Sequence, residues 1–250
     1  MAQHLIETYG FKESNQRFEG YPIYKKGRIQ LIKTSKNLLF LDEPILDPTA
    51  YIFLSHHKSE SGIPSLTAHF PGNFSKVAQF GGAPSKLAIT YPSLHQEYLK
   101  QLKNLKSNVL RYSIVTEPMH HGPTSFSKPV LFVEIGSSKE HWQDSDAIET
   151  VCEAVMTTVE KGCSSDKISI GFGGNHYSEK FTKLITESNF ALGAIMPKYA
   201  IINLDKSILN QMITRSIEKV SYAILDWKGI KERDRVISLV EEAGLEIIKL

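Results

Sequence analysis

The residues best suited to chemistry in this sequence are histidines that gather in short segments rich in glycine and proline. Six of the nine histidines lie in four such segments, 55–62, 67–73, 117–123 and 171–177. An imidazole can bind a metal, move a proton near neutral pH or donate to a developing oxyanion. Since scattered structural histidines have no reason to gather at turns, the clustering predicts one polar site built from several loops, and therefore an enzyme.

The run His120-His121-Gly122-Pro123 predicts a turn, because proline fixes its own φ and restricts the residue before it. Adjacent side chains of a regular strand point to opposite faces, whereas in a turn both histidines can face one site. For an isolated pair, one packed and one exposed histidine is the commoner arrangement. The three other histidine segments favour a shared site instead.

A glycine-rich run, Gly171-Phe172-Gly173-Gly174-Asn175-His176, suggests a nucleotide loop but lacks the residues for one. The dinucleotide fingerprint needs glycine where His176 stands, and the P-loop needs a Gly-Lys-Ser/Thr that is absent. The run predicts a strand-to-helix turn whose N–H groups, at Gly173 and Gly174, can meet a phosphate or a carbonyl oxygen. Glycines that only relieve steric crowding explain the turn equally well, but they leave His176 unexplained.

Carboxylates and lysines add further candidates. Glu134 ends an apolar run, where an unpaired carboxylate is costly, so we expect it to have a partner or a metal. Glu117, beside the histidine pair, is a second candidate. Lysines near the loops can bind phosphate, although any single one is more often a solvated surface charge: Lys58, Lys86, Lys180, Lys183 and Lys198. The H-E-x-x-H, G-x-S-x-G and zinc-deaminase motifs are absent from the sequence.

The composition indicates an ordinary globular protein. Hydrophobic residues make up 41% and charged residues 22% of the 250 residues, and the net charge of +2 is too small to demand a nucleic-acid partner. Cys152 and Cys163 form no C-x-x-C pair, which argues against a disulfide scaffold or a thiolate zinc site. With no apolar run of about 20 residues and no signal-peptide pattern, we expect a cytoplasmic protein without membrane contact.

Apolar runs alternate with amphipathic stretches along most of the chain. We expect strands at 28–33, 51–54, 111–116, 130–135, 167–172, 191–195, 222–225 and 245–249. Helices are expected at 1–9, 91–106, 140–161, 177–188, 206–217 and 231–243. This alternation predicts an α/β fold, one domain over residues 1–250 with a central mixed, largely parallel sheet flanked by helices. Three histidine segments follow expected strands, so they should meet along one edge of that sheet.

Several of these runs together resemble the archaeal and plant type of D-aminoacyl-tRNA deacylase. The matching runs are Ser55, His57, Ser59 and Ser61-Gly62; Pro64-Ser65-Leu66-Thr67, His69 and Pro71-Gly72-Asn73; His120-His121-Gly122-Pro123; Phe132-Val133-Glu134-Ile135-Gly136-Ser137; and Gly173-Gly174-Asn175-His176-Tyr177. They stand in the family's order and cover roughly residues 50–185. Asn175 replaces a glycine of the family pattern. Members also open with a strand ahead of the helix expected at Met1, so this chain is expected to lack that strand.

The resemblance implies hydrolysis of the ester between a D-amino acid and the 3′ end of tRNA, which removes D-amino acids from translation. It also implies zinc and a fold similar to those of peptidyl-tRNA hydrolases and nucleoside phosphorylases. A non-catalytic RNA-binding module, or a phosphorylase or nucleosidase on a similar fold, are the alternatives. The first leaves the histidines unexplained, and the second needs a purine-stacking aromatic and a phosphate site that the sequence does not identify.

With this resemblance we assign the chemistry to five residues, His57, His120, His121, His176 and Glu134. The four histidines among them are also the expected zinc ligands. Substrate contacts are expected at Ser61, Gly62, His69, Asn73, Gly173, Gly174, Tyr177, Lys180 and Lys183. The acceptor end of D-aminoacyl-tRNA is the expected partner, and the protein is expected to act as a monomer.

Overall fold

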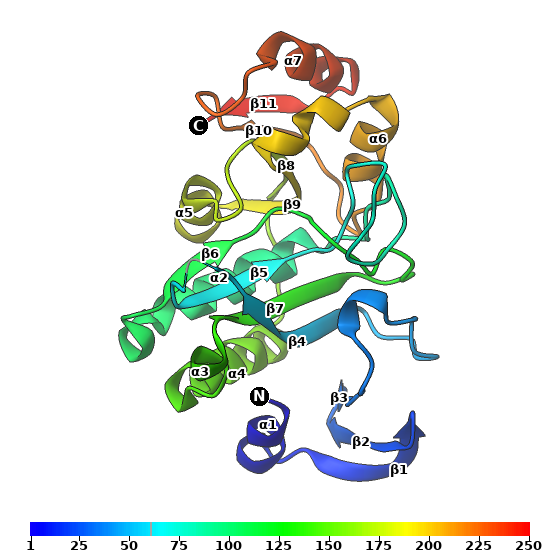
Figure 1. Cartoon of the computed structure of the whole chain (residues 1–250), viewed down its shortest axis with the longest axis vertical. Coiled ribbons are helices and arrows are strands. Elements are labelled where there is room, and N and C mark those ends of the chain that lie inside the picture. Colours follow the sequence, from blue (N-terminus) through cyan, green and yellow to red (C-terminus); the bar gives the residue numbers. More distant parts are fainter. Residues whose placement is uncertain (61) are drawn as a thin grey trace.

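Two four-stranded sheets make up the centre of the computed structural model, which describes residues 1–60 and 62–250 (Figure 1). The first sheet is mixed and has the order β4 (Tyr51–Lys58), β7 (Val130–Ser137), β5 (Ser65–His69), β6 (Ser113–Thr116). The second is parallel and has the order β11 (Glu246–Lys249), β10 (Tyr222–Leu225), β8 (Lys167–Phe172), β9 (Phe190–Met196). Near the N-terminus an antiparallel sheet contains β1 (Lys12–Phe18), β2 (Tyr21–Lys26) and β3 (Ile29–Leu31).

The mixed sheet contains strands that run in opposite directions. β4 is parallel to β7, while β5 is antiparallel to β7 and parallel to β6. β7 lies between β4 and β5 and is buried along its whole length, as its apolar run Val130-Leu131-Phe132-Val133 predicts for a strand covered on both faces. The carboxyl ends of β4 and β5 therefore lie at opposite ends of the sheet.

The helices are α1 (Ala2–Tyr9), α2 (Pro92–Asn104), α3 (Lys139–Trp142), α4 (Ser145–Lys161), α5 (Glu179–Glu187), α6 (Lys206–Thr214) and α7 (Arg233–Glu242). Local signals set their ends: the Asp144 carboxylate accepts from the N–H groups of Asp146 and Ala147 at the start of α4, and Gly10 adopts the left-handed conformation after α1. Among the described residues, no helix is both long and apolar enough to cross a membrane.

Helix α2 joins the two central sheets. It contacts β5 and β6 of the mixed sheet and β8 and β9 of the parallel sheet, and its side chains Tyr98, Leu99 and Leu102 are fully buried. Leu66 of the mixed sheet and Ile170 of the parallel sheet belong to the same apolar cluster. The cluster fixes the two sheets against each other, and this holds their histidine-bearing ends together.

The α/β fold class is confirmed, but the single central sheet is wrong, because the strands divide between two sheets. β1, β2 and β5 were not expected. β1 is almost wholly polar, Lys-Glu-Ser-Asn-Gln-Arg-Phe, and β5 is a short buried strand in which Ser65, Thr67 and His69 alternate with two apolar residues, so neither contains a continuous apolar run. The helix expected at 140–161 is divided into α3 and α4. That one domain spans the chain stays a prediction.

Candidate active site

One face of the mixed sheet forms the floor of the candidate site. Every second residue of β5 points to this face, and pairing places Thr67 opposite Glu134 of β7. In the same way Ser65 pairs with Gly136, which pairs with His57 of β4. The face thus brings together His57, Glu134, Thr67 and His69, with Glu117 following directly after β6.

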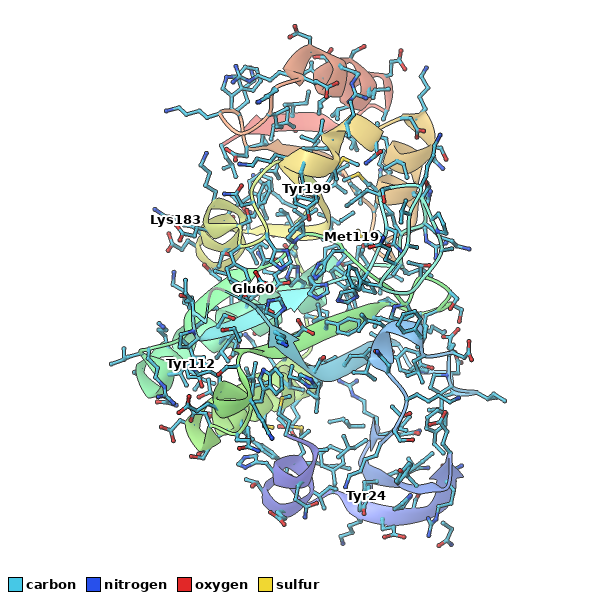
Figure 2. All side chains as sticks on the ribbon, in the orientation of Figure 1. Tyr24, Glu60, Tyr112, Met119, Lys183 and Tyr199 are labelled. Atoms are coloured by element: carbon cyan, nitrogen blue, oxygen red, sulfur yellow. The ribbon has the colours of Figure 1, made fainter. Side chains whose placement is uncertain are left out.

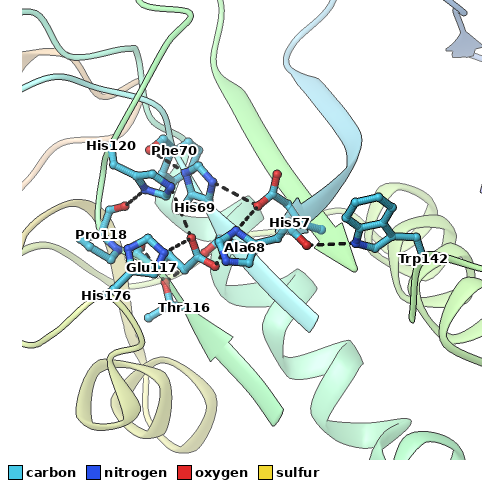
Figure 3. Close-up of polar contacts among 11 residues, drawn as sticks. His57, Ala68, His69, Phe70, Thr116, Glu117, Pro118, His120, Trp142 and His176 are labelled. Carbon is cyan, nitrogen blue, oxygen red and sulfur yellow. Dashed lines mark hydrogen bonds and ion pairs between the residues drawn. The ribbon is translucent and has the colours of Figure 1, made fainter. Parts of the chain in front are cut away.

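Two loops bring further histidines onto this floor. His120 and His121 follow β6, and His176 follows β8 of the other sheet. The ring centroids of His57 and His176 are 5.6 Å apart, and those of His120 and His176 are 4.8 Å apart (Figure 3). His69 lies 4.4 Å from His120 and 4.9 Å from His121, measured in the same way. The structure thus brings histidines of all four segments together, while their sharing of one functional pocket stays a prediction.

Two buried carboxylates lie among these rings. Glu117 Oε2 is 3.3 Å from His176 Nε2 and 3.5 Å from His120 Nε2, and its Oε1 is 3.9 Å from His57 Nδ1. Glu134 Oε2 is 3.6 Å from His57 Nδ1 and 3.8 Å from His69 Nε2 (Figure 3). His57 therefore lies between the two carboxylates. The partners expected for Glu134 are these two histidines.

The surroundings shift the pKa values of the two carboxyl groups in opposite directions. Burial and the charge of Glu134 raise the pKa of Glu117, and these effects outweigh the neighbouring imidazoles. Burial also opposes ionisation of Glu134, but its contacts with His57 and His69 outweigh burial and hold its pKa well below the usual range. At neutral pH, Glu134 is the better stabilised anion.

The histidines are likewise divided by their surroundings. Burial lowers the pKa of His57 and of His69, but contact with Glu134 and the charge of Glu117 outweigh it, so both pKa values are raised. Burial and the charge of His69 lower the pKa of His120 well below its usual range and that of His121 to about 4. Burial and the charge of His57 lower the pKa of His176 to about 4. The last three rings are neutral at neutral pH.

Neutral imidazoles with a free nitrogen are what a metal requires. The Nδ1–H of His69, His120 and His121 donates to the backbone carbonyl of Phe70, Pro118 and Gly122, at 3.2, 2.8 and 2.7 Å. These bonds leave Nε2 of each ring as the nitrogen that can bind a metal, the usual arrangement of metal-binding histidines; His120 and His121 are already neutral, whereas His69, with its raised pKa, must first lose a proton. Potential ligand atoms of these three residues lie within 4.8 Å of one another, as do those of His57-Glu117-His176 and of His69-Glu117-Glu134.

Buried polar atoms without hydrogen-bond partners also support a metal ion at this site. His69 Nε2 and both carboxylate oxygens of Glu117 are buried and have no hydrogen-bond partner among the described residues. Buried polar atoms without partners are rare in folded proteins and mark strain, catalysis or an ion. The donor set of imidazole nitrogens and carboxylate oxygens fits zinc.

The glycine turn after β8 has a structural explanation. Gly173 and Gly174 have φ of 108° and 73°, values that other residues rarely adopt. A Cβ at Gly173 would lie 2.7 Å from Asp226 Cβ, and one at Gly174 would lie 2.6 Å from Ser178 Oγ. The N–H of Gly173 donates to the Met196 carbonyl at 2.9 Å. The suggestion that this N–H could stabilise an oxyanion is therefore wrong, because it is already bound.

The other residues expected to contact the substrate differ in their placement. Tyr177 lies beside His57 and His176, with ring centroids 6.0 and 5.4 Å away. Asn73 instead holds a neighbouring loop, since its Nδ2 donates to the carbonyls of Gly81 and Ala83 at 2.9 and 3.2 Å. Gly62 is exposed with φ 67°, and Ser61 lies outside the described residues.

The two lysines after the glycine turn are not equivalent. Lys180 is paired with the buried carboxylate of Asp226, which lies against Gly173. The Lys183 side chain is 77% exposed, with Nζ 3.9 Å from Glu187 Oε2. Lys183 is therefore the more available cation for a phosphate.

Sequence reasoning underestimated two residues. His69 was assigned to the substrate, yet it contacts both members of the His120-His121 pair and Glu134. Glu117 was given second place, yet it has three histidine nitrogens within 3.9 Å. The period-two spacing of Ser65, Thr67 and His69 was a signal that could have indicated a polar strand face.

Comparison with known proteins gives matches over most or all of the chain. The model of a family described as D-aminoacyl-tRNA deacylase matches residues 45–248. A D-aminoacyl-tRNA deacylase of Pyrococcus furiosus is 37% identical, covering 100% of this chain and 94% of the relative. One of Methanocaldococcus jannaschii is 38% identical, covering 88% of this chain and 90% of the relative. The crystal structure of AF0625, a conserved protein of unknown function, superposes with a TM-score of 0.91 at 28% identity, covering 99% of this chain and 89% of that one.

Proposed function

The chain belongs to the D-aminoacyl-tRNA deacylase family and hydrolyses the ester bond of D-aminoacyl-tRNA, and we propose that it does so in the pocket of five histidines and two glutamates described above. The observation that supports this most strongly is the convergence of His57, His120 and His176 from three separate segments on Glu117. Neither a phosphorylase nor a non-catalytic RNA-binding module is favoured by the family match.

We propose that the pocket holds zinc through His69, His120 and His121. Their Nδ1–H groups are fixed by backbone carbonyls, which leaves Nε2 of each ring as the ligand atom, and potential ligand atoms of the three residues lie within 4.8 Å of one another. His69 replaces His57 and His176 of the ligand set expected from the sequence. When bound, zinc supplies a Lewis acid that polarises the ester carbonyl and makes water nucleophilic at neutral pH.

We assign the proton transfers to the two histidines left outside this ligand set. Ester hydrolysis needs a base for the attacking water and an acid for the departing 3′ ribose oxygen. His176 has a low pKa and a side chain that is 41% exposed, with Nε2 3.3 Å from Glu117, and it accepts the proton of the water. His57 has a raised pKa beside Glu134 and donates its proton to the ribose oxygen. Opposite surroundings thus separate the base from the acid.

The test compares D-tyrosyl-tRNA with L-tyrosyl-tRNA as substrates, before and after a chelator and after zinc is returned. We expect preferential hydrolysis of the D-ester, its loss on chelation and its recovery with zinc. His57→Ala and His176→Ala should each lower turnover by roughly 10²–10⁴-fold.

His56→Ala is the matched control, because His56 neighbours His57 on β4 but points to the opposite face, where its ring packs 4.2 Å from that of Trp142. Full activity of the His57 and His176 variants would show that the reaction does not take place in this pocket. Full activity after complete chelation would show that the reaction does not need zinc.

We further propose that the protein works in the cytoplasm, where tRNAs are charged and used, and that it acts as a monomer on the acceptor end. One chain contains all the residues assigned above. Light scattering on the purified protein tests the monomer, and a dimer at working concentration would contradict it.

A further inference from the structure

An exposed apolar surface lies on η3 (Lys198–Asn203), the 3₁₀ helix that follows β9. Tyr199, which Figure 2 labels, is 61% exposed, and Ile202 is 71% exposed. Side chains three residues apart lie on the same side of a 3₁₀ helix, so these two form one apolar face. A single exposed apolar residue is common on protein surfaces and needs no explanation. An aromatic and an aliphatic side chain exposed together beside a polar site indicate a surface that binds a ligand.

Backbone hydrogen bonds place this face beside the histidine pocket. Gly173 N–H donates to Met196 at 2.9 Å, and Lys198 N–H donates to Gly174 at 3.1 Å. The first turn of η3 is thereby fixed to the glycine turn that presents His176. Burial and the charge of Glu117 raise the pKa of Tyr199, which agrees with a phenol directed toward the pocket while much of the ring stays exposed.

The substrate supplies the chemistry that fits such a face. The ester that is hydrolysed sits on the ribose of the terminal nucleotide, and the base is joined to the same ribose. With the ester in the pocket, the base must therefore lie within one nucleoside of it. The acceptor end of tRNA is unpaired, and unpaired bases are bound by stacking on aromatic side chains, often with a cation beside the backbone.

Building on the proposed function, we propose that Tyr199 stacks against the terminal adenine base of tRNA and so positions the ester over the histidine pocket. Ile202 continues the apolar face, and the exposed Lys198 offers a cation to the phosphate of the same nucleotide. Tyr199 is thus a substrate-binding residue that no motif of the sequence identified.

A second exposed aromatic near the pocket provides the competing location. Phe80 is 66% exposed, and its carbonyl accepts from the N–H of Gly122 at 3.0 Å, next to His121. We favour Tyr199 because it adjoins the turn of His176 and has Ile202 on the same face. Phe80 is included in the test.

The experiment measures inhibition of D-tyrosyl-tRNA hydrolysis by AMP and by ribose 5-phosphate, which lacks the base. For Tyr199→Ala we expect KM for the tRNA and Ki for AMP to rise roughly 5- to 150-fold, the loss of one stacked base, with Ki for ribose 5-phosphate unchanged. Tyr199→Phe should behave as the parent, because stacking needs only the ring. Tyr21→Ala is the matched control, since Tyr21 is 41% exposed in the N-terminal sheet.

Three results would overturn the proposal. In the first, Tyr199→Ala leaves KM and Ki for AMP unchanged. In the second, Tyr199→Phe loses as much as Tyr199→Ala, so that the hydroxyl is what acts. In the third, Phe80→Ala raises Ki for AMP while Tyr199→Ala does not, which would show that the base binds at Phe80 instead. If the parent protein fails to hydrolyse D-tyrosyl-tRNA at all, the proposed function has failed instead.

Discussion

The two buried glutamates of the pocket should respond in opposite ways to the same isosteric change. Glu134→Gln removes a carboxylate whose contacts with His57 and His69 outweigh its burial, whereas Glu117→Gln removes one whose burial outweighs its contacts with three histidine nitrogens at 3.3 to 3.9 Å. The folded-state pKa of Glu134 is depressed, so its stabilisation is present above its unfolded value near 4.5 and is lost as pH falls. The folded-state pKa of Glu117 is raised, so the stabilisation from its protonated carboxyl group is lost as pH rises. At pH 7 the buried carboxylate of Glu117 therefore lowers the stability of the fold.

The magnitudes follow from these pairings. Removing one partner of a buried charge pair costs about 3–5 kcal/mol, and 1 kcal/mol shifts Tm by roughly 2–4 °C in a chain of this size. We expect metal-free Glu134→Gln to melt at least about 6 °C below the parent at pH 7, and Glu117→Gln to melt at or above it. Both variants should lose about 10²–10⁴-fold in turnover.

Thermal unfolding of chelator-treated protein, followed by circular dichroism, measures the difference. Glu160→Gln is the control, since Glu160 is about half exposed in its pair with Lys26 and such pairs contribute little. The reasoning fails if Glu117→Gln melts as low as Glu134→Gln, or if Glu134→Gln melts with the parent.

Three further predictions follow from the site and its surroundings. Zinc binding at pH 7 should release up to about one proton from the imidazole of His69, the ligand whose pKa is raised. Calorimetry measures this as a heat that depends on the ionisation enthalpy of the buffer, and a heat independent of the buffer would contradict it. His95 is fully buried with its pKa lowered to about 4, so the unfolded chain takes up a proton first on acidification and stability should fall by up to about 3 kcal/mol between pH 6.5 and 4. His95→Gln should flatten that part of the stability profile, and an unchanged profile would argue against this histidine as the cause. Lys183→Glu should weaken tRNA binding and reduce the salt slope by about 1, measured by filter binding. Lys180→Glu should also lower Tm, because it breaks the ion pair of the half-exposed Lys180 with the buried carboxylate of Asp226. Equal affinity and slope for Lys183→Glu would place the tRNA surface elsewhere.

The sequence predicted the parts of the fold that depend on local patterns. β7 begins with a continuous apolar run, β8 carries apolar residues at alternate positions, and α4 ends at a glycine, so each was found within a few residues. β5 was missed because both of its faces are buried and one of them is polar. Ser65, Thr67 and His69 are buried to serve the site, which cancels the apolar signal on which strand prediction depends.

Residue types and spacing alone indicated a histidine enzyme and the motifs of its family, because turn-forming glycine and proline next to imidazoles are visible without coordinates. Strand direction and pairing were not, since a strand has the same pattern whichever way it runs. β5 runs against β7, and that pairing brings His69 and Glu117 to the pocket that His57 reaches from the other end. The packing of two sheets on α2 adds His176, and the same packing leaves Tyr199 exposed at its edge. Contacts between distant segments depend on the whole core, so only the tertiary structure decided which histidines meet.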